Sequence, residues 1–357
     1  MRKGRSLVSV LATTALTLGL ITAVAAPANA ALPVAPTSSQ TTGDRPGATE
    51  LGFAVSDRVT ASVDVGTGNL RVSTSSLSLV GVNGQVEIGR TYNSLRATLG
   101  STSTSAANRW TLSVGGVGWL AAGASGAVIY TDGSGATWQF TPSTTTPGAF
   151  VSPAGAKADL ALSSGNYTLT ERESRQVATF NADGHPISIT DRNGNTTTIS
   201  YSSPGIPSAV VSSAGPIAAR TATLDYPGPY GGQLTATQTS GASSRQVTWT
   251  KDASSNLTSM VDAMGRSTTF AYSGQLLTSI TGPTGATISF EYQATTNRVL
   301  RVSQSNTSPG SPGTSDTRLA YPSTTQTLLA RPNTNQSSPV ASVPRVTYAI
   351  ASSSRLV

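Results

Sequence analysis

A spaced repeat constrains the fold of this chain more than any other feature of its sequence. Residues 180–201 start with Phe180 and a Gly turn. An alternating strand, a turn from Asp191 to Gly194 and a second alternating strand follow, and the copy ends at Tyr201. Strand, tight turn and strand in this order are typical of a β-hairpin. Internal repeats define an architecture, so the sequence predicts an all-β protein built as an array of antiparallel β-hairpins.

Two further copies of the repeat follow the first. Residues 251–272 keep Asp262 and Gly265 in the turn, although Lys251 replaces the leading aromatic residue. Residues 276–292 form a third copy, in which a glycine replaces the aspartate of the turn. The predicted structural positions of the repeat are Phe180, Gly184, Asp191, Gly194, Tyr201, Asp262, Gly265, Tyr272, Gly285 and Tyr292.

The turn residues have a direct conformational reason. Gly184 and Gly194 can adopt the positive φ that hairpin turns require. Asp191 and Asp262 can accept backbone N–H groups of their own turns, as in an Asx turn. Calcium binding is the alternative for these aspartates, but calcium loops gather several oxygen ligands within a few residues. Each repeat offers about one carboxylate, so we predict no metal and no cofactor.

Aromatic residues recur where the strands of the repeat end. The stretch between the first two copies is long enough for two degenerate copies, marked by Tyr226, Tyr230 and Trp249. We favour packing as their role, because aromatic rings supply the largest apolar area available to a small core. Stacking on sugars is the alternative. Exposure of the repeat tyrosines would favour binding, and burial would favour a shell.

Residues 1–30 have the three parts of a secretory signal peptide. A basic start at Arg2, Lys3 and Arg5 precedes an apolar stretch of small residues, and residues 28–30 form an A-x-A cleavage site. An uncleaved anchor is the alternative, since the apolar stretch approaches the length of a bilayer span. We favour cleavage before Ala31. This predicts a secreted or cell-surface protein with no stable membrane span after cleavage.

The charge of the chain argues against a nucleic-acid partner. The formal net charge is +7, and it falls to +4 without the three basic residues of the signal. This surplus is spread along the chain, whereas nucleic-acid binding proteins cluster their basic residues on one face or stripe. The chain also has no cysteine. Stability must therefore come from strand pairing and from apolar faces buried across many repeats.

Composition divides the remaining chain into four segments. They are a flexible linker at 31–52, an N-terminal β domain at 53–179, the repeats at 180–302, and a Ser/Thr/Pro-rich segment at 303–357. That last segment could be a disordered tail, but residues 318–321 and 345–348 have strand patterns. Residues 351–357 match the opening of a repeat, so we expect a chain that stops in mid-repeat and belongs to a larger protein.

Catalytic groups are scarce. His185 is the only histidine, and it lies in a turn between a glycine and a proline. A Ser-His-Asp site would have to use it, but a catalytic base needs a supporting shell that a turn does not provide. Glu171 and Glu173 are two apart, which on a strand places them on one face. Neighbouring arginines indicate a solvated hairpin tip instead. We predict that the protein is not an enzyme.

These residues resemble the YD-repeat, or Rhs, family of secreted bacterial proteins. Residues 180–201 are close to that repeat, and residues 63–70, 90–94 and 116–119 look like the domain that precedes it. The resemblance implies a β-strip that spirals into a hollow shell, which often encloses a C-terminal toxin released by self-cleavage. This chain shows no shell-closing segment, self-cleavage motif or toxin domain, so the resemblance extends only to structural positions.

Two functional hypotheses follow. The first is a structural β-repeat protein, exported and forming part of a shell, with a C-terminal remainder or cargo domain as its partner. The alternative is a module that binds carbohydrate or the cell wall through its aromatic-rich sheet, with a glycan as its partner.

Overall fold

A computed structural model describes residues 32, 41–82, 84–96, 109–213, 219–227, 232–240, 243–306 and 313–350. The chain divides into two compact units, Met1–Ala30 and Ala31–Val357. The first unit, which contains the expected signal peptide, lies outside the described residues. Within those residues, η1 (Ala124–Gly126) and η3 (Val340–Ser342) are short 3-10 helices. No helix in the described part is long and apolar enough to cross a membrane.

The second unit is all-β and antiparallel, as the repeat predicts. Its largest sheet has 17 strands in the order of the chain, so each strand pairs with its sequence neighbours, and the sheet is open. Its strands are β10 (Ala158–Ser163), β11 (Asn166–Glu171), β12 (Val177–Phe180), β13 (Pro186–Thr190), β14 (Thr196–Ser203), β15 (Ile206–Val211), β16 (Thr221–Asp225), β17 (Gln233–Ser240), β18 (Ser243–Lys251), β19 (Leu257–Val261), β20 (Ser267–Ser273), β21 (Leu276–Thr281), β22 (Thr287–Tyr292), β23 (Val299–Asn306), β24 (Gly313–Ser323), β25 (Gln326–Ala330) and β26 (Val346–Ala349).

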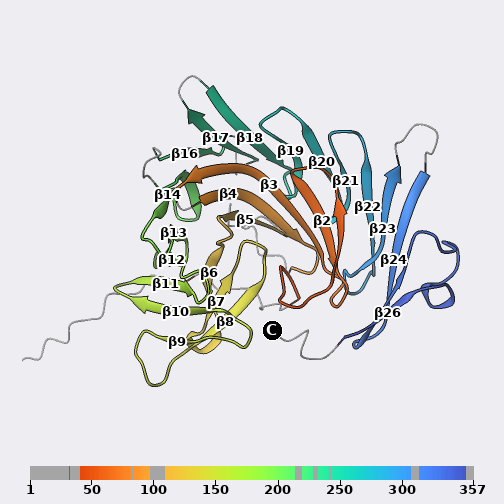
Figure 1. The fold of residues 1–357 in the computed structure, drawn as a ribbon, viewed down its shortest axis with the longest axis horizontal. Coiled ribbons are helices and arrows are strands. Elements are labelled where there is room, and N and C mark those ends of the chain that lie inside the picture. Colours follow the sequence, from red (N-terminus) through yellow and green to blue (C-terminus); the bar gives the residue numbers. More distant parts are fainter. Residues whose placement is uncertain are drawn as a thin grey trace, which may run out of the picture. The chain divides into compact units, whose positions relative to one another are not determined.

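Two smaller sheets precede the large one in the chain. The five-stranded sheet contains β1 (Glu50–Ala54), β2 (Val59–Asp64), β3 (Leu70–Gly81), β4 (Gly84–Asn93) and β5 (Trp110–Val114). The four-stranded sheet contains β6 (Trp119–Ala122), β7 (Val128–Thr131), β8 (Thr137–Pro142) and β9 (Phe150–Val151). Figure 1 shows the large sheet as an arc, green to blue, that curves around the strands of the five-stranded sheet.

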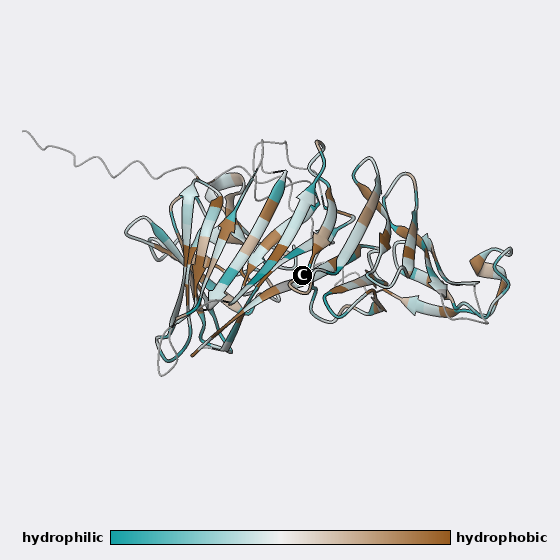
Figure 2. Cartoon of the chain, turned by 90° about the horizontal axis from the view of Figure 1, so that it is seen from above, coloured by the Kyte–Doolittle hydropathy of each residue, from teal (hydrophilic) through white to brown (hydrophobic). Residues whose placement is uncertain are grey.

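Alternation along the strands explains why the arc has one buried face. Along β20, Thr268 and Phe270 are buried, whereas Ser267, Thr269 and Ala271 are exposed. Successive side chains of a strand point to opposite faces, so the apolar residues gather on one side of the sheet. Figure 2 shows the resulting alternation of hydrophobic and hydrophilic bands along the strands.

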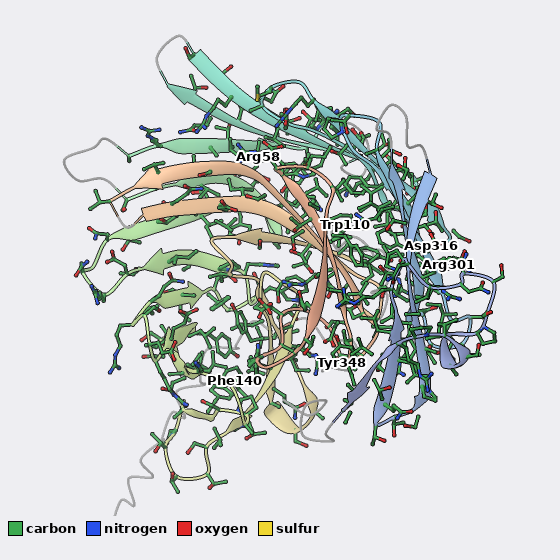
Figure 3. The ribbon with its side chains drawn as sticks, turned by 45° about the vertical axis from the view of Figure 1, so that its right-hand side comes forward. Arg58, Trp110, Phe140, Arg301, Asp316 and Tyr348 are labelled. Atoms are coloured by element: carbon green, nitrogen blue, oxygen red, sulfur yellow. The ribbon has the colours of Figure 1, made fainter. Side chains whose placement is uncertain are left out.

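The five-stranded sheet covers this buried face. The ring centroids of Trp110 in β5 and Phe270 in β20 are 5.4 Å apart in an edge-to-face arrangement. The backbone N–H of Val299 in β23 donates to the carbonyl of Gly68 in the β2–β3 turn at 2.9 Å. Figure 3 places Trp110 between the two sheets. The core of the second unit therefore lies between the five-stranded sheet and the concave face of the arc.

The expected linker is fixed where the structure describes it, at residues 41–52. The hydroxyl of Thr42 donates to the carbonyl of Gly135 at 2.8 Å. The guanidinium of Arg45 pairs with the carboxylate of Asp64 at 2.6 Å, and both side chains are buried. Composition predicted a mobile segment here because it could not show these distant partners.

The segment boundaries are less sharp than composition indicates. The strands β10 to β12, in the segment expected to precede the repeats, already belong to the 17-stranded sheet. At the other end, the strand expected at 318–321 lies within β24, and the strand expected at 345–348 corresponds to β26, which begins one residue later. Residues 351–357, which match the opening of a repeat, lie outside the described residues.

Candidate functional site

The aspartates of the repeat close their own turns. Asp191 Oδ1 accepts the backbone N–H groups of Asn193 at 2.8 Å and of Asn195 at 2.9 Å. Asp262 Oδ1 accepts those of Met264 and Arg266, both at 2.9 Å. This is the Asx-turn geometry. The described residues contain no group of three or more His, Cys, Asp or Glu side chains that could hold a metal ion.

The turn glycines differ in what surrounds them. Gly194, Gly265 and Gly285 have φ between +75° and +85°, and an added Cβ would meet no atom within 4 Å. Gly184 has φ +81°, and its Cβ would lie 2.3 Å from the carbonyl oxygen of Leu120 in β6. Leu120 also donates its backbone N–H to the carbonyl of Gly184 at 2.8 Å. The first turn of the repeat therefore docks on the four-stranded sheet.

The repeat tyrosines are half-buried and pack against the core. Each donates its hydroxyl to a carbonyl 15 residues earlier: Tyr201 to Pro186 at 2.7 Å, Tyr272 to Leu257 at 2.8 Å and Tyr292 to Leu277 at 2.6 Å. A register shift lies beside each tyrosine, where the strand pairs with the next one. Such bulges redirect a side chain. The tyrosine hydroxyls therefore stabilise the sheet through hydrogen bonds to its backbone. Phe180, at the leading aromatic position, is fully buried.

Tyr272 and the neighbouring residues of β21 also contact the five-stranded sheet. The indole N–H of Trp110 donates to the Tyr272 hydroxyl at 2.8 Å. Tyr92 in β4 accepts the backbone N–H of Leu277 at 3.0 Å and donates to the carbonyl of Gln275 at 3.3 Å. Burial raises the pKa of Tyr92 to about 12, and the backbone N–H of Leu277 opposes the shift. Aromatic residues of both sheets therefore form one seam.

The motif at residues 90–94 forms a polar junction beside this seam. Asn93 Oδ1 accepts the backbone N–H of Gly43 at 2.8 Å and the side-chain amide of Asn69 at 2.7 Å. Its own amide donates to the carbonyl of Ser134 at 2.8 Å. The hydroxyl of Ser94 accepts the backbone N–H of Leu70 at 2.9 Å. Buried polar groups need partners, and these residues supply them between β3, β4 and the β7–β8 turn.

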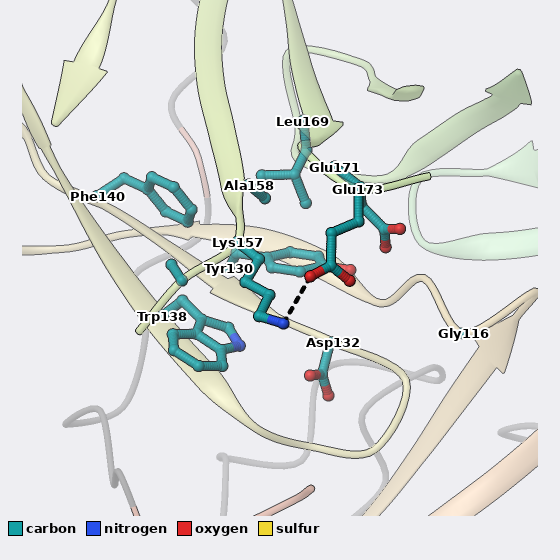
Figure 4. Close-up of a pocket in the computed structure, with 11 residues that line it drawn as sticks. Gly116, Tyr130, Asp132, Trp138, Phe140, Lys157, Ala158, Leu169, Glu171 and Glu173 are labelled. Carbon is teal, nitrogen blue, oxygen red and sulfur yellow. Dashed lines mark hydrogen bonds and ion pairs between the residues drawn. The ribbon is translucent and has the colours of Figure 1, made fainter. Parts of the chain in front are cut away.

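A cavity of about 310 Å³ lies between β7–β8 and β10–β11. Figure 4 shows Tyr130, Trp138 and Phe140 around it, with Lys157 reaching across to Glu173. Those two side chains form an exposed ion pair at 2.7 Å. The sequence did not indicate that these strands enclose a cavity with the next hairpin.

The cavity is acidic. Asp132 and Glu171 line it together with Glu173, against the single cation Lys157. Burial raises the pKa of Asp132, and hydrogen bonds from Ser134, Ala136 and Trp138 oppose that shift. Burial also raises the pKa of Tyr130, and the charges of Asp132 and Glu171 add to this. The arrangement combines aromatic faces with acceptor oxygens, which suits a polar ligand that carries hydroxyl or amine donors.

His185 does not contribute to this cavity. Its ring packs against the ring of Tyr201, with centroids 5.6 Å apart. Its backbone N–H donates to Asn181 Oδ1 at 2.9 Å, which closes the turn. Burial lowers the pKa of its imidazole. The absence of catalysis stays a prediction.

No family model and no curated protein matches the chain. The crystal structure of a porin-like protein from Bacteroides uniformis ATCC 8492 is 11% identical to it, with a TM-score of 0.30. That match covers 69% of this chain and 94% of that chain. The crystal structure of TcdB2-TccC3 is 10% identical over 79% of this chain, with a TM-score of 0.28. This chain spans only 17% of the length of that one.

Proposed function

We propose that this protein is a structural β-repeat protein, secreted or held at the cell surface, and that its arc is a segment of a shell wall. The observation that carries the proposal is the use of the repeat aromatics. The tyrosine hydroxyls bond to backbone carbonyls within the arc, and Phe270 and Tyr272 contact Trp110 of the five-stranded sheet. Aromatic side chains that are used for packing within the fold support a role as shell wall better than a role as sugar-binding face.

The resemblance to YD-repeat proteins adds a partner to this proposal. A shell of that kind encloses a cargo domain. The five-stranded sheet fills the concave side of the arc, where the N–H of Val299 bonds to Gly68 and the hydroxyl of Thr327 bonds to Val65. A cargo would therefore lie outside the volume that this sheet occupies, in contact with further wall.

Export and limited proteolysis test the proposal together. The chain is expressed in a bacterial host, and the medium and cell surface are examined for a product that begins at Ala31. We expect this product to resist protease as one piece from β1 to β26, because the two sheets protect each other. Retention in the cytoplasm, or rapid trimming of the 17 strands back to the five-stranded sheet, would contradict the proposal.

A second function is favoured by the acidic cavity rather than by the aromatic-rich sheet. Trp138 is half-buried beside Asp132 and Glu171, and this combination suits a cell-wall sugar that carries hydroxyl or amine groups. If the cavity binds such a glycan, Trp138→Ala should abolish retention of the protein on purified cell walls. Met264→Ala, which alters an apolar side chain 77% exposed in the β19–β20 turn, is the control. Equal retention of both variants would remove this function.

A further inference from the structure

Within the described part of the chain, Arg90 is a buried cation without a counter-ion. It lies in β4 and is 1% exposed, with its guanidinium carbon 6.0 Å from the ring centroid of Trp249 in β18. Among the described residues, its Nε and Nη1 atoms have no hydrogen-bond partner, and no carboxylate pairs with it. A buried unpaired charge strongly destabilises a fold. This position therefore requires an acceptor that the described residues do not provide.

Three further polar side chains lie near Arg90: its guanidinium faces the Trp249 ring, and its charge interacts with Tyr226 and Lys251. The indole N–H of Trp249 and the hydroxyl of Tyr226, which follows β16, are also buried without partners in the described part of the chain. Lys251, at the end of β18, is half-buried and adds a second cation. Guanidinium, indole and ammonium groups are donors only. The four side chains, here called the Arg90 cluster, thus present donors from two sheets and no carboxylate.

The cluster coincides with the degenerate copies of the repeat. The triplets Phe270-Ala271-Tyr272 and Trp249-Thr250-Lys251 both end beside a register shift. Lys251, the leading residue of the second copy, therefore also closes the degenerate copy before it, at the position that Tyr272 holds in the second copy. Tyr226 ends the preceding copy, but unlike Tyr272 it has no carbonyl partner in the described residues. Lys251 and Tyr226, the two residues that depart from the pattern, therefore both lie near Arg90, which β4 buries against the arc.

We propose that the Arg90 cluster binds a tetrahedral oxyanion of the phosphate or sulfate class. Such an anion offers acceptors in several directions, which matches donors that arrive from β4, β18 and the segment after β16. It also neutralises Arg90 and Lys251 together, which water cannot do. Arginine and oxyanions form strong charge-assisted hydrogen bonds. The half-buried side of the cluster, at Lys251, is where the anion enters.

Titration of the full chain with inorganic phosphate at constant ionic strength tests this. Calorimetry should show one phosphate bound per chain, and the melting temperature should rise with phosphate concentration. Arg90→Met should fold, because an apolar side chain replaces an unpaired buried charge, and it should lose the phosphate response. Arg318→Met is the matched control. Arg318 is also buried, but backbone carbonyls of Asn335, Gln336 and Ser338 accept its donors, so its loss should leave phosphate binding unchanged.

Two milder variants keep the test decisive if Arg90→Met does not fold. Trp249→Phe removes one donor and retains the ring, and Lys251→Tyr restores the residue type of the other copies. Each should weaken phosphate binding roughly tenfold, the equivalent of one hydrogen bond to a charged group. No phosphate binding by the unmodified chain, or equal affinity in these variants and the unmodified chain, would overturn the proposal.

Discussion

Lys251 shows how one residue change within a repeat alters local chemistry. Burial, together with the nearby charge of Arg90, lowers the pKa of Lys251 from 10.5 to about 8. The unfolded chain therefore binds this proton more tightly than the folded chain. Burying Lys251 therefore destabilises the fold by its full amount below pH 8, and this destabilisation disappears as the pH rises through the ordinary lysine pKa.

Amine labelling should reveal this lowered pKa. The chain has only three lysines, at positions 3, 157 and 251, so mass spectrometry separates them readily. We expect the acylation rate of Lys251 to level off with a midpoint near pH 8, because the neutral amine is the nucleophile. A midpoint near 10.5, the ordinary lysine value, would contradict the expectation.

Tyr272 has a larger structural role than Tyr201, because its hydroxyl serves two partners. It donates to the carbonyl of Leu257 and accepts the indole N–H of Trp110. Tyr272→Phe should cost about 2–3 kcal/mol in the free energy of unfolding, since it leaves a buried donor unpaired, whereas Tyr201→Phe should cost about 1 kcal/mol. Urea denaturation of both variants measures the difference. Equal losses would show that the Trp110 contact contributes nothing.

The sequence predicted part of this chemistry. Aromatic burial followed from residue type and spacing, and the Asx turns followed from Asp-x-x-Gly. The carbonyl partner of each tyrosine did not, because it depends on a bulge that alternation does not encode. Arg90 and Trp249 could not be linked either. They are far apart in sequence, and a strand pattern does not specify which sheet covers its buried face.

At the scale of the element, the Gly184 turn is distinguished by its docking on β6. Gly184→Ala and Gly194→Ala both place alanine at positive φ, which costs roughly 1–2 kcal/mol. Only at Gly184 would the new Cβ also clash with the Leu120 carbonyl. We expect Gly184→Ala to lose roughly 1–3 kcal/mol more than Gly194→Ala. Thermal unfolding of the two variants checks this, and equal melting temperatures would mean that the turn is not docked.

Elements were more predictable than their assembly. Strands and turns follow from local alternation and from glycine, so the hairpins of the repeat were predicted near their observed positions. The joining of β10 to β12 to the repeat strands was not predicted, because an edge strand carries no sequence mark of the sheet it extends. The fixed conformation of residues 41–52 was missed for a related reason. Arg45 finds Asp64, and Thr42 finds Gly135, only after the sheets have formed.

At the scale of the second unit, local and distant contacts have separate roles. The 17 strands pair in chain order, so the arc itself is built from neighbouring segments. The contacts that fix its curvature around the five-stranded sheet join residues far apart in sequence. The hydroxyl of Thr327 in β25, for example, donates to the carbonyl of Val65 across 262 positions. Docking of the two sheets should therefore make their unfolding cooperative.

The variant Thr327→Val tests this cooperativity, because it keeps the shape of a fully buried side chain and removes its bond to Val65. Unfolding should remain a single transition, with the free energy lowered by about 1–2 kcal/mol and an unchanged dependence on denaturant.

Hydrogen exchange locates the effect, because the Val299 N–H bonds to Gly68 across the same interface. Exchange at Val299 should accelerate in Thr327→Val, but not in Thr190→Val, which removes a hydroxyl pair within one hairpin. Two separate transitions would instead show that the five-stranded sheet and the arc fold independently. The arc would then need another partner to hold its curvature.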